Sequence, residues 1–282
     1  MFNENLLTQL KSIDLRDISY QKLASLFQLG KHSLPFTTAI VPKETAIERG
    51  RINHNGEIFH SENEISYRTD IENIKKFGRA NSPFQSRFYG AIPSEDIKHA
   101  RVILFTELCE EYRCEPVKYV DTTVTVGRWT VIEEFEVAQM AFDERYFVSE
   151  EIKKIRDNWI TKLSQNNDIP LEQFQKTLEF FSAEFAKPDI KHTDDYKLSC
   201  LYTDFAIHSA GLKGIFYPSC RADYKGYNIV VTPEIVEKKL RLDVVAMFRL
   251  KVTNGKGALF PIAQSDQLGT LNTKFIWEDA KI

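Results

Sequence analysis

The stretch that decides the fold is residues 67–107, YRTDIENIKKFGRANSPFQSRFYGAIPSEDIKHARVILFTE. Two of its arginines are Arg68 and Arg79, and the second lies in a Gly-Arg-Ala-Asn turn. A Phe-Tyr pair ending in Tyr89 follows, and then an apolar run with one acid, Glu107. An arginine presents a planar, permanently charged fork that matches phosphate oxygens, and a tyrosine ring stacks on flat ligands. The stretch therefore indicates a site for an anionic, aromatic ligand.

Each of these residues also has a purely structural interpretation. Arg68 and Arg79 could be surface arginines in ion pairs, and Tyr89 could be a half-buried strand residue. Glu107 follows Leu104 by three residues, so in a helix it shares the apolar face. A carboxylate in that position either forms a buried salt bridge or serves a site.

A second stretch, residues 214–228, has the sequence GIFYPSCRADYKGYN and is the expected partner of the first. Ser219 follows Pro218 at the end of an apolar strand, which is a common place for ligand contacts. A turn serine explains the same residue, so both interpretations stay open at this point.

Composition narrows the class of protein. The 282 residues are 43% hydrophobic and 27% charged, with 37 basic and 40 acidic residues and a net charge of −3. This balance argues against a general nucleic-acid binder, which has a basic excess. The four cysteines form no CxxC pair and have no zinc-type spacing, so no metal is expected. The start of the chain does not read as a signal peptide and no apolar run approaches the roughly 20 residues of a membrane span, which predicts a cytoplasmic protein with reduced thiols and no membrane contact.

Hydrophobic periodicity predicts an α+β fold. Helices are expected over residues 4–30 in two pieces, 43–51, 94–112, 149–163, 170–186, 193–210 and a short one from 232. Strands are expected over 65–70, 87–92, 214–217 and 241–252, with a hairpin over 118–142 that turns at Gly127-Arg128. Residues 30–42 and 71–86 are expected to be loops.

The ordered set of motifs resembles a known family. Tyr67-Arg68, Gly78-Arg79-Ala80-Asn81, Phe88-Tyr89-Gly90-Ala91 and residues 100–107 are similar to the first half of the RES domain, a family named for an arginine, a glutamate and a serine. Residues 211–219 with Asn228 are similar to its second half. The resemblance covers residues 64–235, with a helical insertion at about 148–190. It departs at Ala80, where the family usually carries tryptophan.

The resemblance implies an ADP-ribosyltransferase-like module with a cleft for NAD. RES proteins consume NAD by hydrolysis or phosphorolysis, often as the toxin of a toxin–antitoxin pair. By resemblance, Glu107 and Arg68 are catalytic. Arg68, Arg79, Tyr89, Ser219 and Asn228 bind NAD. Further expectations are inorganic phosphate as an alternative to water, a cognate antitoxin and a homodimer.

The expected organisation is a helical N-terminal extension over residues 1–60 and a RES-like domain over 61–282. Two rival functions stay open. One is a protein ADP-ribosyltransferase, which would transfer ADP-ribose to a protein side chain. The other is a non-catalytic interaction module, which would show no NAD turnover and would tolerate the loss of Glu107.

Overall fold

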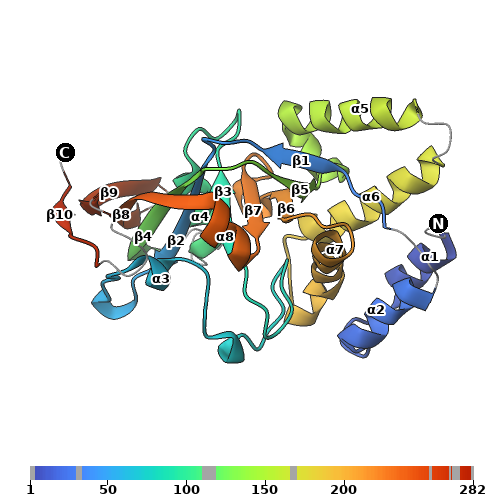
Figure 1. The fold of residues 1–282 in the computed structure, drawn as a ribbon, viewed down its shortest axis with the longest axis horizontal. Coiled ribbons are helices and arrows are strands. Elements are labelled where there is room, and N and C mark those ends of the chain that lie inside the picture. Colours follow the sequence, from blue (N-terminus) through green and yellow to red (C-terminus); the bar gives the residue numbers. More distant parts are fainter. Residues whose placement is uncertain are drawn as a thin grey trace. The chain divides into compact units, whose positions relative to one another are not determined.

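The computed structural model describes residues 4–29, 34–109, 119–165, 170–253, 256–266, 268 and 274–280. Within them the protein is a mixed α+β structure whose strands pair mostly antiparallel, as the hydrophobic periodicity predicts (Figure 1). The chain forms two compact units that alternate along the sequence. Unit 1 comprises Met1–Ile40, Asp70–Gln85 and Glu136–Cys220, and unit 2 comprises Val41–Thr69, Ser86–Phe135 and Arg221–Ile282.

Unit 1 is mainly helical. Its helices are α1 (Glu4–Ser12), α2 (Tyr20–Leu29), α5 (Glu150–Ser164), α6 (Leu171–Ala186) and α7 (Lys197–His208). Its strands are β1 (Thr38–Val41), β5 (Phe135–Gln139) and β6 (Gly214–Pro218), in the order β1-β5-β6, with β5 and β6 parallel. The two helices expected over 4–30, those over 149–163 and 170–186, and the strand over 214–217 are confirmed.

Aromatic side chains fill the interior of unit 1. Leu178, Phe181 and Phe185 recur at helical spacing on α6 and are fully buried. The ring of Phe181 lies 4.5 Å from that of Tyr202 on α7, and the ring of Phe185 lies 5.0 Å from that of Tyr217 on β6. Helix α6, predicted as part of an insertion, therefore supplies much of the core of this unit.

Unit 2 is mainly a sheet with the strand order β7-β3-β2-β4-β8-β9-β10. The strands are β2 (Ala46–Ile52), β3 (Phe88–Ile92), β4 (Val120–Val131), β7 (Tyr227–Val231), β8 (Leu240–Thr253), β9 (Lys256–Ser265) and β10 (Glu278–Asp279). The helices are α3 (Glu62–Ile65), α4 (Ala100–Leu108) and α8 (Pro233–Lys239). Neighbouring strands in this order pair antiparallel.

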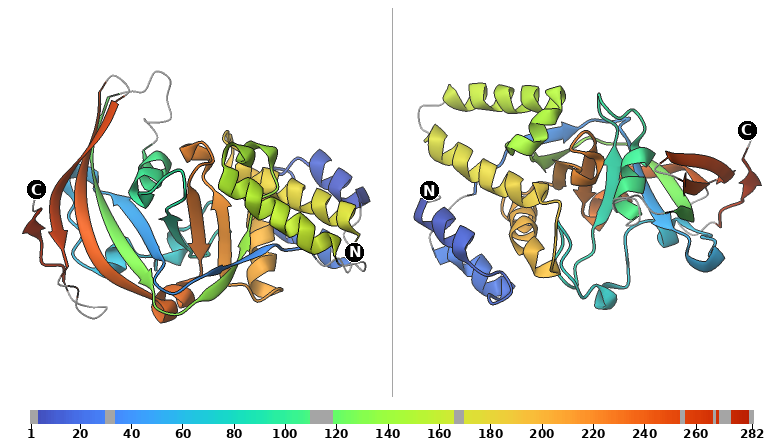
Figure 2. Two further views of the ribbon diagram at one scale, coloured as in Figure 1. Left: turned by 90° about the horizontal axis from the view of Figure 1, so that it is seen from above. Right: turned by 180° about the vertical axis from the view of Figure 1, so that it is seen from behind.

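The sheet of unit 2 buries both faces. Helix α4 lies on the concave face, as Figure 2 shows on the left. Its residues Ile103, Leu104 and Phe105 belong to one buried cluster with the strand residues Val124 and Val126. On the other face the ring of Trp129 lies 5.0 Å from that of Phe88, and the Trp129 indole nitrogen donates to Glu62 of α3 at 3.0 Å. The two faces therefore carry different side-chain sets, as period-two alternation requires.

Two expected elements in the first part of unit 2 were wrong. Of the residues 43–51 expected as a helix, 46–51 lie in strand β2, where charged side chains find partners within the unit. Residues 65–70 are not a strand. The helix α3 ends at Ile65, and it begins where the Glu64 carboxylate accepts the Ser61 backbone N–H at 3.0 Å.

The hairpin expected at Gly127-Arg128 was also wrong. Strand β4 runs straight through this dipeptide and pairs with β2 and β8. Gly127 is needed there for another reason, since a Cβ atom at this position would lie 2.6 Å from the Trp129 ring. The glycine makes room for a buried indole and forms no turn.

Other expectations differ at their ends. Residues 38–41 of the expected loop form β1, so the expected N-terminal extension contains strands after its two helices. The helix expected to start at Thr193 begins as a short 3₁₀ turn and becomes α7 at Lys197. The strand over 241–252 and the helix after Thr232 are confirmed as β8 and α8.

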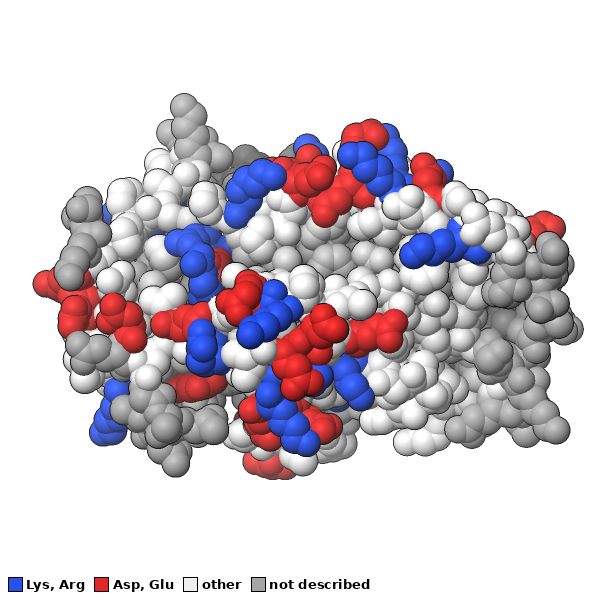
Figure 3. All heavy atoms as spheres, turned by 45° about the horizontal axis from the view of Figure 1, so that its top comes forward, with Lys and Arg blue, Asp and Glu red and all other residues white. Residues whose placement is uncertain are grey.

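On the face drawn in Figure 3, acidic and basic side chains lie intermixed. Ion pairs of α8 include Lys238 with Glu234 at 2.9 Å and Lys239 with Glu133 at 2.7 Å. The net charge of the whole chain is −3.

Candidate functional site

Two predicted site residues far apart in the sequence meet in unit 2. The Asn228 side-chain amide, on β7, donates a hydrogen bond of 2.8 Å to Oε1 of Glu107, in the last turn of α4. Asn228 is 8% exposed and Glu107 is half-buried. A carboxylate on the apolar face of α4 thus has a fixed amide partner, and its other surroundings are partly open to solvent.

A hydrogen bond joins the loop before α4 to the loop before β7, and it helps to hold Glu107 near Asn228. The Ser94 hydroxyl accepts the Ile97 backbone N–H at 2.9 Å and donates to the Lys225 carbonyl. The predicted role of Ser94 as the start of a helix was wrong, because α4 begins only at Ala100. Ser94 instead ties the segment leading into α4 to the segment leading into β7.

Tyr89 lies on the same sheet face as Asn228. Strand β3 pairs with β7 so that Tyr89 is opposite Val230 and Ala91 is opposite Asn228. Side chains at alternate positions share a face, so Tyr89, Ala91, Asn228 and Val230 all point to one side. Ala91 belongs to the core cluster under α4, and Tyr89 is half-buried. The face under α4 thus holds an aromatic ring as well as the amide–carboxylate pair.

An arginine that the sequence reasoning missed supports β3 from the opposite face. Arg49 on β2 donates to the carbonyls of Tyr89 at 2.8 Å, Ser66 at 3.0 Å and Ile65 at 3.1 Å, and its guanidinium lies 5.3 Å from the Phe88 ring. Burial, together with the nearby Arg51 charge, lowers the pKa of Arg49 to about 10. The sequence pattern that could have indicated this arginine is the alternation of Ile47, Arg49 and Arg51, which places all three on one side of a strand.

Arg68 lies on an exposed loop of unit 2 that follows α3. Its backbone carbonyl accepts a 2.5 Å hydrogen bond from the Ser86 hydroxyl, which fixes the backbone of the loop. Arg68 itself is exposed. Such a position suits contact with a ligand that arrives from solution.

Arg79 lies in unit 1, in the turn where Gly78 and Asn81 form an antiparallel bridge. Its guanidinium donates to the carbonyls of Phe185 at 2.6 Å and Lys187 at 3.0 Å, at the end of α6. The last carbonyls of a helix have no partner inside the helix, so the arginine caps α6. These contacts support a structural role, and a role in binding phosphate stays a prediction.

Ser219 follows β6 in the same unit and is fully buried. The neighbouring Cys220 is half-buried, and its sulfur lies 3.5 Å from Nη2 of Arg79. The structure thus brings the Arg79 turn to the residue beside Ser219, and Ala80 in that turn is also fully buried. The six predicted residues divide between the units: Arg79 and Ser219 lie in unit 1, and Arg68, Tyr89, Glu107 and Asn228 lie in unit 2.

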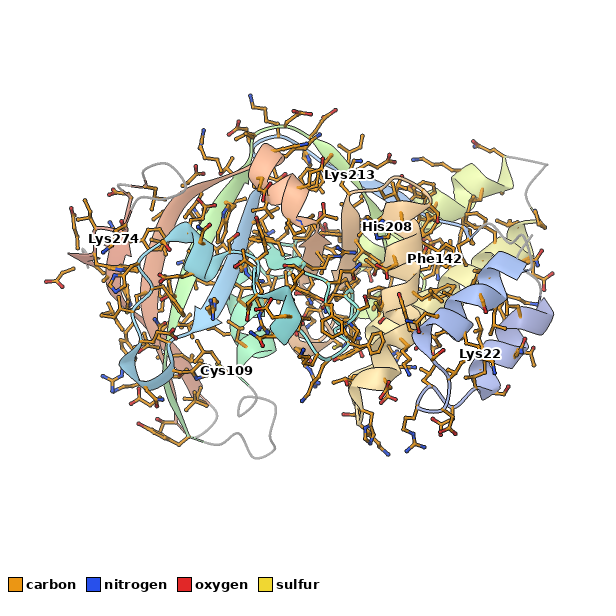
Figure 4. All side chains as sticks on the ribbon, turned by 60° about the horizontal axis from the view of Figure 1, so that its bottom comes forward. Lys22, Cys109, Phe142, His208, Lys213 and Lys274 are labelled. Carbon is orange, nitrogen blue, oxygen red and sulfur yellow. The ribbon has the colours of Figure 1, made fainter. Side chains whose placement is uncertain are left out.

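The described residues also limit cysteine and metal chemistry. Cys109, labelled in Figure 4, lies just after α4, and its side chain is buried. Among the described residues no group of three or more His, Cys, Asp or Glu side chains is arranged to hold a metal ion. In the same part of the chain no helix has both the length and the apolar character to cross a membrane.

A scan of the sequence against models of known protein families finds no match, and a search of curated proteins also finds none. Inferences about function therefore depend on the residues described above and on the motifs that carry the resemblance.

Proposed function

We propose that this protein consumes NAD by breaking the bond between nicotinamide and ribose, as RES-type enzymes do. The observation that supports this best is the hydrogen bond between Glu107 and Asn228. These two residues come from separate motifs, and they meet under α4 on the face that also carries Tyr89. The proposal includes an ADP-ribosyltransferase-like arrangement of the site.

Cleavage of the nicotinamide–ribose bond is favoured by a carboxylate beside the ribose. Cleavage of the nicotinamide–ribose bond passes through a state with positive charge on the ribose, as in glycoside cleavage. A carboxylate held in place stabilises this charge more than it stabilises the neutral sugar, which accelerates the step. The Asn228 amide would fix the orientation of the Glu107 carboxylate. Nicotinamide leaves as a neutral molecule, so no strong general acid is needed.

The remaining residues have binding roles in this proposal. Tyr89 offers a ring for nicotinamide, and Arg68, on its exposed loop, clamps the diphosphate through charge-assisted hydrogen bonds. Arg79 and Ser219 stay proposed contacts to phosphate and ribose from their sequence motifs alone. Water or inorganic phosphate then attacks the ribose, and a protein side chain would take that place in an ADP-ribosyltransferase.

The decisive experiment is incubation of the purified protein with NAD, with and without phosphate, followed by product analysis. Free ADP-ribose indicates hydrolysis, and a phosphorylated ADP-ribose indicates phosphorolysis. Label transferred to added protein indicates ADP-ribosylation. If NAD is unchanged under all three conditions, the proposal is wrong and the interaction module is favoured.

The variant Glu107→Gln tests the assignment of the carboxylate. It keeps the shape and removes the charge, so NAD cleavage should fall about 100-fold or more. Glu95→Gln, an exposed carboxylate before α4, is the matched control and should retain full turnover. If Glu107→Gln instead lowers the melting temperature and the folded fraction keeps normal turnover, Glu107 is only a structural partner.

A further inference from the structure

A second polar site lies elsewhere in unit 2, over the concave face of the sheet. It is a cavity of about 320 Å³ whose lining includes residues of β2, β4, β8, β9 and α4. Its apolar floor includes Val126, Ala246, Phe248 and Pro261, and Gln264 adds an amide. Its charged wall is formed by Glu48, Arg101 and Arg128. None of these residues has a role in the proposed NAD chemistry.

Two guanidinium groups converge on one carboxylate oxygen in this wall. Arg128 Nη2 lies 3.0 Å and Arg101 Nη2 lies 3.2 Å from Oε1 of Glu48. The Glu48 side chain is 5% exposed, whereas those of Arg101 and Arg128 are 30% and 44% exposed. Two positive charges against one negative charge leave a surplus of one at the edge of the cavity.

The hydrogen bonding of the wall is incomplete. Oε2 of Glu48 and Nε of Arg101 are buried, and neither has a hydrogen-bond partner in the part of the chain that the structure describes. A buried polar atom without a partner destabilises the fold. Among the described residues, Nε of Arg101 is a donor that lacks an acceptor, such as the oxygen of a ligand carboxylate. Oε2 of Glu48 is itself an acceptor and requires a donor instead.

The strand register explains why the charges and the floor share one surface. Glu48 is opposite Arg128 between β2 and β4, and Arg128 is opposite Val244 between β4 and β8. Val126 and Ala246, two residues along, are also opposite each other and point to the same side. A ligand that contacts the guanidinium groups therefore also covers apolar side chains.

We propose that this cavity binds a small monoanionic carboxylate with a flat apolar body, such as an aromatic acid. A carboxylate matches the planar fork of an arginine with two parallel hydrogen bonds, and one negative charge balances the surplus. The apolar floor takes the ring, and the volume lies at the lower end of the range for small-molecule sites, about 300 to 1,000 Å³. This site is independent of the proposed NAD cleavage.

The probe is benzoate, titrated into the purified protein and followed by backbone amide chemical shifts. Benzyl alcohol tests the need for charge, acetate tests the need for the ring, and benzylamine tests the sign of the charge. Benzoate should shift amides of β4, β8 and β9. Benzyl alcohol and benzylamine should bind at least about tenfold more weakly because they lose the charged hydrogen bonds, and acetate should bind at least about tenfold more weakly because it has no ring to cover the apolar floor. Equal binding of benzoate and benzylamine would overturn the proposal, as would the absence of benzoate shifts.

Three variants locate the site. Arg128→Gln removes the more exposed guanidinium and should weaken benzoate about tenfold or more. Ala246→Phe fills the floor and should block benzoate without touching the charges. Glu48→Gln removes the carboxylate that competes for both arginines, so benzoate should bind more tightly.

The matched control is Arg249→Gln, an arginine on β8 that pairs with Asp121 at 2.7 Å and does not line the cavity. Its benzoate affinity should equal that of the wild type. If Arg128→Gln and Ala246→Phe both keep wild-type affinity, benzoate binds elsewhere and the proposal is wrong. If Glu48→Gln weakens benzoate while keeping its melting temperature, the competition argument is wrong. None of these readouts depends on NAD.

Discussion

Arg49 in unit 2 and Arg79 in unit 1 make similar contacts. Each donates hydrogen bonds to three backbone carbonyls, and each lies over an aromatic ring, Phe88 for Arg49 and Tyr196 for Arg79. They differ in position. Arg49 lies within β2 and Arg79 lies in a turn, and both are half-buried.

The difference shows how little an arginine in a motif says about its task. Arg49 joins β2 to β3 and to the end of α3 through backbone carbonyls. Arg79 closes the end of α6 in the same manner. The two arginines differ in the elements that they connect, and neither exposure nor the number of hydrogen bonds separates them.

The largest effect is expected for Arg49→Leu. This change leaves the carbonyls of Ile65, Ser66 and Tyr89 without their donor, so the free energy of unfolding should fall by about 3 kcal/mol or more. Arg51→Leu, on the same strand, is the control and should lose less, since the Arg51 guanidinium donates to the carbonyl of Glu64 whereas that of Arg49 donates to three carbonyls. Urea denaturation of both variants gives the two values. Equal losses would show that the number of carbonyls bound does not set the loss of stability.

A smaller effect is expected for Arg79→Ala. Loss of the cap on α6 should lower the free energy of unfolding by about 2 kcal/mol, a value typical of a lost charge-assisted hydrogen bond. Arg68→Ala, on its exposed loop, should change stability by less than about 0.5 kcal/mol. The proposed function adds that Arg68→Ala raises the KM for NAD. If the Arg79→Ala protein is as stable as the wild type and has a raised KM for NAD, Arg79 binds the ligand and is not needed as a cap on α6.

The smallest effect is expected for Glu184→Gln, in the last turn of α6 beside Arg79. Burial raises the pKa of Glu184 above its ordinary value of 4.5, although the Lys187 ammonium at 2.5 Å opposes this. A raised pKa means that the folded state holds the proton more tightly than the unfolded state. The buried Glu184 charge therefore destabilises the folded state at neutral pH, and this destabilisation disappears as pH falls through the pKa of the folded state.

Glu184→Gln should accordingly raise stability at pH 7, and the gain should shrink as pH falls toward 4.5. Thermal melts of the variant and the wild type at several pH values measure this. Glu179→Gln, which lies on α6 but is exposed, is the control and should show no such trend. A gain that grows toward low pH would mean that the ion pair with Lys187 outweighs burial.

The sequence predicted those elements whose side chains follow one simple period. The helix α6 repeats Phe174, Leu178, Phe181 and Phe185, and β8 alternates over twelve residues, so packing and pattern agree there. Strand β2 was missed because Glu48, Arg49 and Arg51 give it a polar composition. Their partners come from α4, β4 and the loop after α3, which no local pattern reveals.

The candidate site was predicted only in part for the same reason. Glu107 and Asn228 were singled out by their motifs, but the 2.8 Å contact between them depends on the pairing of β3 with β7 and on the position of α4. The use of Arg79 as a cap on α6 could not be predicted, because the carbonyls of Phe185 and Lys187 lie about a hundred residues away in the chain. The turn predicted at Gly127 was wrong for a local reason. The glycine makes room for the indole of Trp129, which is only two residues away.

The alternation of the two units along the sequence has a consequence for synthesis on the ribosome. Strand β3 is made early, but its partner β7 belongs to the last segment of unit 2, and β4 likewise waits for β8. Until those strands emerge, β3 and β4 carry unpaired backbone groups, and such edges invite pairing with other chains. The whole of α5, α6 and α7 is translated during this interval. The sheet of the growing chain is therefore completed late. Its strand edges are most open to pairing with other chains before Tyr227 has left the ribosome.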